Sequence, residues 1–106
     1  MVAAPQVSEE EVRVWLETYR QAWEEKKVDA LVQLGEISAQ NATRLKLVLD
    51  GYKSFRVALK DIIMHSEGSQ AAVRFTRVDT VDGRVLSHPP MDLIIEKGAN
   101  GDLMRK

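Results

Sequence analysis

Apolar residues near the start of the chain recur at intervals of three and four, which places them along one side of a helix. Ser8 followed three residues later by Glu11 is a capping-box pattern, in which each side chain satisfies a backbone N–H at the start of a helix. The pattern therefore predicts a long first helix with one apolar stripe. The stripe consists of Val12, Trp15, Leu16, Tyr19, Ala22 and Trp23.

Two shorter helices are predicted after it. Residues 28–34 carry a brief helical pattern that ends at Gly35. Ser38 is a candidate N-cap for a third helix, which Gly51 would end. The apolar positions of this third helix follow helical spacing: Ala42, Leu45, Leu49 and Tyr52.

From Ser54 onward the period changes to two, the period of a strand with one buried face. Residues 55–60 alternate apolar and polar side chains, and the break at Asp61 indicates the extra residue of a β-bulge. Residues 67–69 are a turn signal, after which residues 71–76 alternate again. The two segments predict a hairpin.

The rest of the chain carries further hairpin signals. Asp82-Gly83 is a strong two-residue turn signal, because both central positions of the favoured hairpin turn need a positive φ. Two adjacent prolines cannot donate ladder hydrogen bonds and therefore belong at a bend, a bulge or an edge. The predicted order is strand 76–81, turn, strand 84–87, bend at Pro89-Pro90, strand 91–97, turn at Asn100-Gly101, and a last strand over 102–106 that stops early.

Helices first and consecutive hairpins afterwards predict the α+β class, with three N-terminal helices packed on a curved antiparallel sheet. A chain of 106 residues fits one domain. We expect that domain to span residues 8–106. Residues 1–7 are small and include a proline, and we expect them to form a flexible N-terminal segment.

Composition excludes several classes of function. The formal net charge is −1, so no overall positive field attracts nucleic acid. The absence of cysteine removes disulfides, thiolate nucleophiles and thiolate metal sites. No apolar run approaches the roughly 20 residues that a membrane helix needs, and the N-terminus lacks a secretion-signal pattern. The predicted protein is soluble, either cytoplasmic or part of a larger envelope protein.

Two stretches carry a family resemblance. Residues 12–31, VRVWLETYRQAWEEKKVDAL, and residues 68–75, GSQAAVRF, resemble the long helix and a recurrent strand of the nuclear-transport-factor-2-like (NTF2-like) superfamily, which includes ketosteroid isomerases and SnoaL-type cyclases. The resemblance implies a cone-like, cystatin/NTF2-like roll, and homodimers that pair sheet to sheet are common in it.

A third stretch points to one subgroup of this superfamily. Residues 77–83, RVDTVDG, look like a hairpin of accessory domains at the ends of bacterial multidomain proteins. Members of the superfamily usually finish with a strand that carries an aromatic residue after the last turn, whereas this chain stops at Lys106 without one. We therefore expect that the last strand is missing or that the sheet is completed differently.

Two groups of residues are candidates for binding. A cone fold commonly leaves an apolar pocket beneath its long helix, so aromatic residues there would line a pocket for a small apolar ligand or simply fill the core. The strand at 91–97 is apolar on both faces, whereas a strand in a sheet with one solvent-exposed face would carry polar residues on that face. The predicted pocket residues are Trp15, Tyr19, Trp23, Tyr52, Phe55 and Phe75, and the predicted interface residues are Met91, Leu93 and Ile94.

No catalytic set is recognisable. Isomerase-type members use a tyrosine and acidic residues inside the cone, and the available types are Tyr19, Tyr52, Asp61, Asp79 and Asp92, none of which maps onto that motif. Asp79 and Asp82 are interpreted as turn and edge residues, and His65 and His88 as exposed loop residues. No metal site and no cofactor are predicted. Lysines and arginines including Arg56 and Lys60 alternate with acids, which indicates a mixed solvated surface.

The leading hypothesis is a non-catalytic ligand-binding or protein-interaction domain that forms a homodimer through its sheet, as an accessory module of a bacterial protein. The alternative is a small isomerase, cyclase or dehydratase that uses a buried acid as a proton shuttle and an aromatic hydroxyl as a donor to an oxyanion. The alternative requires an aspartate and a tyrosine to converge inside the cone.

Overall fold

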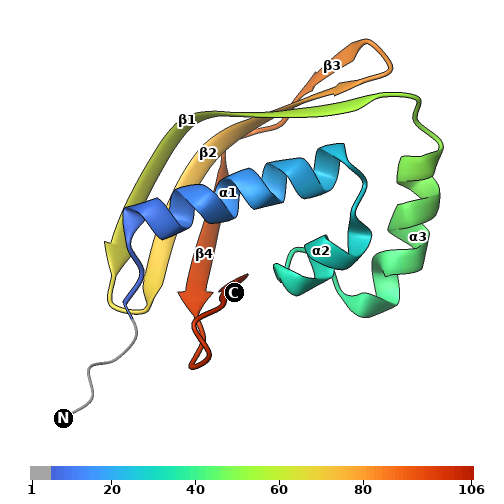
Figure 1. Cartoon of the computed structure of the whole chain (residues 1–106). Coiled ribbons are helices and arrows are strands. Elements are labelled where there is room, and N and C mark those ends of the chain that lie inside the picture. The colour runs from blue at the N-terminus through green and yellow to red at the C-terminus, as the bar shows by residue number, and fades with distance from the viewer. Residues whose placement is uncertain (1–5) are drawn as a thin grey trace.

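A computed structural model describes residues 6–106, and its elements follow the predicted order (Figure 1). Three helices precede the strands: α1 (Glu9–Glu24), α2 (Val28–Gln33) and α3 (Ala39–Asp50). The strands are β1 (Phe55–Glu67), β2 (Gln70–Val81), β3 (Arg84–Ser87), β4 (Met91–Lys97) and β5 (Leu103–Arg105). The predicted α+β class, with helices on a curved antiparallel sheet, is confirmed.

The first helix begins at the predicted capping box. The hydroxyl of Ser8 accepts a hydrogen bond from the backbone N–H of Glu11, and the Glu11 carboxylate accepts one from the backbone N–H of Ser8. The apolar stripe then packs against the sheet, with Val12 and Tyr19 fully buried. The chain is already packed one residue earlier, because Val7 is buried and its N–H donates to the carbonyl of Gly68. The predicted N-terminal segment spans residues 1–7, of which residues 1–5 lie outside the described residues.

The strands form one antiparallel sheet in the order β1-β2-β4-β5, with β3 paired to the far end of β2. β3 and β4 thus lie along the same side of β2, separated by the bend at Pro89 and Pro90. The predicted bulge is present, since the pairing of β1 with β2 shifts between Lys60 and Ile63. Asp61 there has a φ of 53°, and the predicted tight turn places Asp82 at a φ of 49°.

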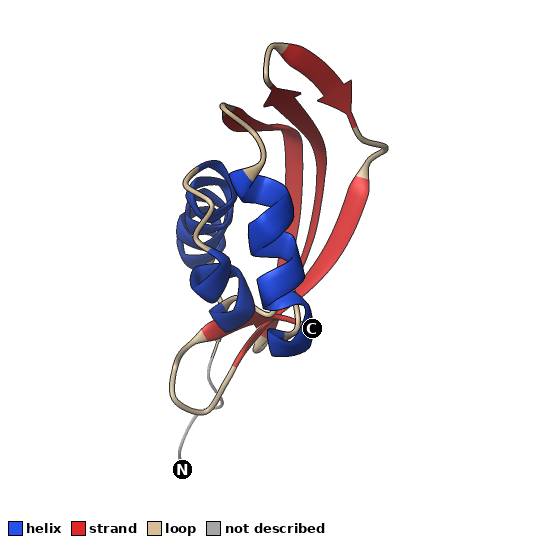
Figure 2. Cartoon of the chain, turned by 90° about the vertical axis from the view of Figure 1, so that its right-hand side faces the viewer, coloured by secondary structure: helices blue, strands red, loops and turns tan. Residues whose placement is uncertain are grey.

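The helices cover only one face of the sheet (Figure 2). Alternate residues of β2 point into the helices and are buried, from Ala71 through Phe75 to Asp79. The residues between them point to the opposite side, which none of the helices within residues 6–106 covers. We call this side the free face; its strand residues include Arg56, Ala58, Lys60, Ile63, His65, Glu67, Ala72, Arg74, Thr76, Val78, Thr80, Val85, Asp92, Ile94, Glu96 and Met104.

The short last strand closes one end of the roll. The N–H of Arg105 donates to the carbonyl of Leu34, just after α2, at 2.8 Å, while Lys106 donates to Ile94 of β4. The backbone passes so close to Gly35 that a Cβ there would lie 2.7 Å from the carbonyl oxygen of Arg105. Gly35 also has a φ of +80°, so both its conformation and the space around it favour glycine.

Candidate functional site

All six aromatic residues of the chain lie in one cluster beneath and beside α1. Two groups stack within it: Trp15 with Tyr19, and Trp23 with Phe55. Phe75 meets Tyr19 edge-on, and Tyr52 extends the second group through Phe55. These are the six residues predicted to line a pocket. The structure brings all of them together; that they line a ligand pocket stays a prediction.

Arg77 joins the two aromatic groups. Its guanidinium lies 4.3 Å from the ring centroid of Trp23 and 5.6 Å from that of Tyr19, within the range of cation–π attraction. It also donates hydrogen bonds of 2.8 Å to the Tyr19 hydroxyl and to a carboxylate oxygen of Asp79. A buried cation is tolerated only when paired and hydrogen-bonded, and Arg77 meets both conditions.

Asp79 differs from its predicted role as a turn or edge residue. It is 5% exposed on the helix-covered face of β2, and the prediction was wrong because a buried carboxylate was not expected without knowledge of its partners. One carboxylate oxygen accepts from Arg77, and the other lies 2.9 Å from Nε2 of His88. His88 is exposed as predicted, yet it connects the buried cluster to the surface beside the Pro89 bend.

A second ion pair, partly buried, lies near the first. Arg105 donates to Glu36 at 2.7 Å, and the Glu36 side chain is 9% exposed. Burial raises the pKa of Glu36 above its ordinary value, although the positive charges of Arg105 and Arg77 act in the opposite direction. Burial likewise raises the pKa of the Tyr19 hydroxyl. Sequence reasoning missed Glu36, because it lies in a loop far from both arginines along the chain.

Several buried polar atoms around the cluster lack a hydrogen-bond partner among residues 6–106. They include the indole nitrogens of Trp15 and Trp23 and one carboxylate oxygen of Glu36. Each such group costs roughly 1–3 kcal/mol when no partner is present. These atoms could be satisfied by a small polar molecule or by water.

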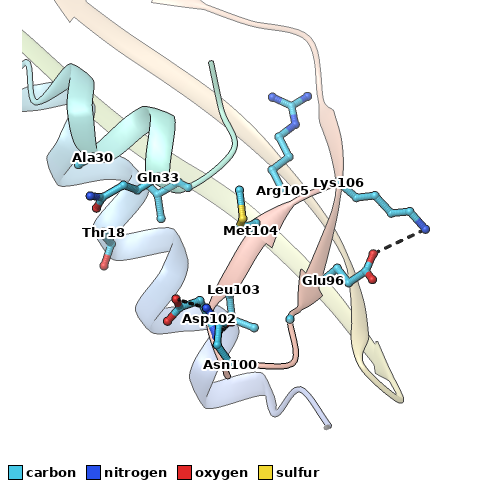
Figure 3. A pocket seen from close by; sticks show the side chains of 12 residues that line it. Thr18, Ala30, Gln33, Glu96, Asn100, Asp102, Leu103, Met104, Arg105 and Lys106 are labelled. Atoms are coloured by element: carbon cyan, nitrogen blue, oxygen red, sulfur yellow. Dashed lines mark hydrogen bonds and ion pairs between the residues drawn. The ribbon is translucent and has the colours of Figure 1, made fainter. Parts of the chain in front are cut away.

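A hollow of about 900 Å³ lies between α1, α2 and the turn before β5 (Figure 3). Thr18, Ala30 and Gln33 approach it from the helices, and Asn100 and Arg105 from the other side. Ligand sites commonly have volumes of roughly 300–1,000 Å³. None of the six predicted pocket residues lines this hollow, whereas Arg105, which does line it, pairs with Glu36.

The predicted interface residues lie on both sides of β4. Leu93 is buried beneath the helices and Met91 is half-buried, whereas Ile94 is 41% exposed on the free face. Ile94 is paired with Ala72 of β2. Ile63 of β1 is paired with Arg74, two residues along β2 from Ala72. Ile63 is 67% exposed, so Ile63, Ala72 and Ile94 form an apolar patch on the free face. Met104 is 46% exposed and lines the hollow.

The remaining sequence candidates form no site. Asp61 is exposed at the bulge, and Asp92 is exposed beside Arg74. Asp82 is a turn residue as predicted, and its carboxylate accepts hydrogen bonds from two backbone N–H groups just before β1. Over the described residues, no group of histidines and acids is placed to hold a metal ion. No helix between residues 6 and 106 is long and apolar enough to span a bilayer.

No protein-family model and no curated protein matches the sequence. Solved structures do match. A protein of the NTF2-like family from Streptomyces avermitilis, which carries the name of a dehydratase, is 13% identical with a TM-score of 0.71, covering 91% of this chain and 88% of that one. This chain has the NTF2-like fold. At such identity the likeness shows the fold alone.

Two further matches are longer proteins. Bd1075 of Bdellovibrio bacteriovorus is 15% identical with a TM-score of 0.74, and the helical cell shape determining protein Pgp2 of Campylobacter jejuni is 11% identical with a TM-score of 0.73. The matches cover 91% and 90% of this chain. The chain spans only 37% and 38% of the length of those two proteins.

Proposed function

We propose that this chain is a non-catalytic interaction domain that forms a homodimer through the free face of its sheet. The observation that carries the proposal is the apolar patch of Ile63, Ala72 and Ile94. Three adjacent strands contribute to it, β1, β2 and β4, so it is a surface feature of the folded sheet and not of one segment. Ala72 and Ile94 are paired in the sheet, and Ile63 lies diagonally across from Ala72. Exposed apolar patches mark protein-interaction sites.

The domain acts as a module within a larger bacterial assembly or chain. Support comes from Bd1075 and Pgp2, in which the same fold occupies little more than a third of the protein. A small domain that supplies self-association would bring two copies of an attached protein together. The Asp79 carboxylate has both oxygens engaged, which fits a non-catalytic role for this residue.

Oligomeric state tests the proposal. Light scattering coupled to size-exclusion chromatography at micromolar concentration should give the mass of a dimer. Ile94→Lys should give a monomer, because a charge would be buried in the apolar patch. Val14→Lys is the matched control: Val14 is 62% exposed on α1, away from the free face, and this variant should remain a dimer. A monomeric wild-type protein would refute the proposal.

A second candidate is the binding of a small ligand, with proton-transfer catalysis as its enzymatic form. The specific observation in its favour is that Asp79 and Tyr19 converge on Arg77 beneath α1, near buried indole N–H groups without partners. Titration with a fragment library, monitored by tryptophan fluorescence, would test ligand binding, because Trp15 and Trp23 both belong to this cluster. A ligand whose signal is lost in Arg77→Met, in a variant that still folds, would support this candidate.

A further inference from the structure

We infer that the two copies pair antiparallel, with the basic end of one free face over the acidic end of the other. This orientation rests on the proposed dimer and adds a specific contact to it, between Arg56 of one copy and Glu67 of the second copy. Both residues are on β1, at opposite ends of the strand.

The pairing registers order the free face into rows that run across the strands. At one end, Arg56 lies beside Thr80, which lies beside Val85. At the other end, Glu67 lies beside Gln70, which lies beside Glu96. Four rows lie between these two end rows. In order from the Arg56 end, they are Ala58 with Val78, Lys60 with Thr76, Ile63 with Arg74 and Asp92, and His65 with Ala72 and Ile94.

The two ends of this face differ in charge. Arg56 and Lys60 form no ion pair within the described part of the chain, and the two rows that contain them hold no acid. The nearest acids are Asp61, which follows Lys60 at the bulge, and Asp92 in the next row. The other end carries Glu67, Asp92 and Glu96. Asp92 lies 3.9 Å from Arg74, and Glu96 lies 3.7 Å from Lys106. Among the described residues, the ion-pair partner of Glu67 is a histidine, His65, at 4.0 Å.

A two-fold dimer can satisfy both ends at once. In a symmetric interface each contact occurs twice, so the same surface must complement itself. If the axis lies between the sheets and perpendicular to the strands, β1 faces β1 of the second copy in the reverse direction. Arg56 then meets Glu67 of the second copy, Val78 lies over Ala72, and Ser87 lies over Ile94. In the same arrangement Lys60 lies over Ile63. An axis parallel to the strands would instead place basic rows together.

Charge exchange at these two positions tests the orientation. Arg56→Glu and Glu67→Arg should each raise the dissociation constant of the dimer by about tenfold or more, because each places like charges together twice. The double variant carrying both changes should return to within about threefold of wild type, since the pair is restored with reversed sign. Arg13→Glu, at an exposed position on α1, is the control and should change nothing.

Sedimentation velocity over a range of concentrations gives these constants, and circular dichroism checks that each variant folds. An equimolar mixture of the two single variants should also associate more strongly than either alone. If Ile94→Lys breaks the dimer but the double charge exchange gives no recovery over the single variants, the orientation is wrong while the dimer stands. A wild-type monomer would overturn both.

Discussion

The guanidinium of Arg77 donates a 2.8 Å hydrogen bond to the hydroxyl of Tyr19, a residue 58 positions earlier in the chain. The same guanidinium pairs with Asp79 and stacks on Trp23. The first helix is therefore held on the sheet by a polar contact as well as by its apolar stripe. Because the proposed dimer surface is the opposite side of the same strand, the position of β2 against α1 also sets the shape of the free face.

Removing one member of the buried pair should be costly. Arg77→Met leaves the Asp79 carboxylate buried beside His88 alone, and we expect it to lower the free energy of unfolding by about 3–5 kcal/mol. The double variant Arg77→Met with Asp79→Leu should lose less than the sum of the single losses, since no uncompensated charge remains. Urea unfolding measures both.

The exposed pair Lys46 and Asp50 on α3 provides the comparison. Lys46→Ala should change the free energy of unfolding by less than about 1 kcal/mol. Equal losses at Arg77 and Lys46 would mean that the interior pair has no special contribution.

The pKa of Glu36 predicts a pH dependence of stability. Burial raises this pKa above its ordinary value of 4.5, so the folded state favours the protonated carboxyl. The contribution of Glu36 to stability is therefore full below the unfolded pKa and is lost as pH rises through the folded pKa. Wild type should lose stability relative to Glu36→Gln over that interval. Denaturant unfolding of both proteins across the interval checks this, and parallel curves would contradict it.

Two glycines with positive φ separate backbone strain from steric contact. Gly68, in the turn between β1 and β2, has a φ of +60°, and no atom lies within 4 Å of the position that a Cβ would take. Gly68→Ala should therefore cost about 1–2 kcal/mol from backbone strain alone. Gly35→Ala adds a clash with the backbone of Arg105 and should cost clearly more. It should also release β5, which hydrogen exchange of the Arg105 amide would detect.

Sequence patterning was sufficient for the order of helices and strands, because capping, turns and periodicity are local properties. The capping box at Ser8, the bulge at Asp61 and the turn at Asp82 all lie where the sequence predicted them. The six aromatic residues were also recognised as one group, since helical spacing and strand alternation point them to the same side.

The polar interior could not be predicted in the same way. Arg77 and Asp79 alternate with apolar residues on β2, but only the packed structure shows that Tyr19 and Trp23 lie opposite them. Glu36 meets Arg105 across 69 positions of sequence. Long-range pairs of this kind have no local periodicity, so composition and spacing did not reveal them.

The central claim, self-association through the free face, is tested most directly by intermolecular distances. The chain contains no cysteine, so a spin label can be attached at a single introduced cysteine. Pulsed electron paramagnetic resonance should give a defined intermolecular distance for Ala72→Cys, on the free face, that is shorter than the one for Val14→Cys, on the outer side of α1. A shorter distance at Val14, or no intermolecular coupling at either position, would contradict the claim.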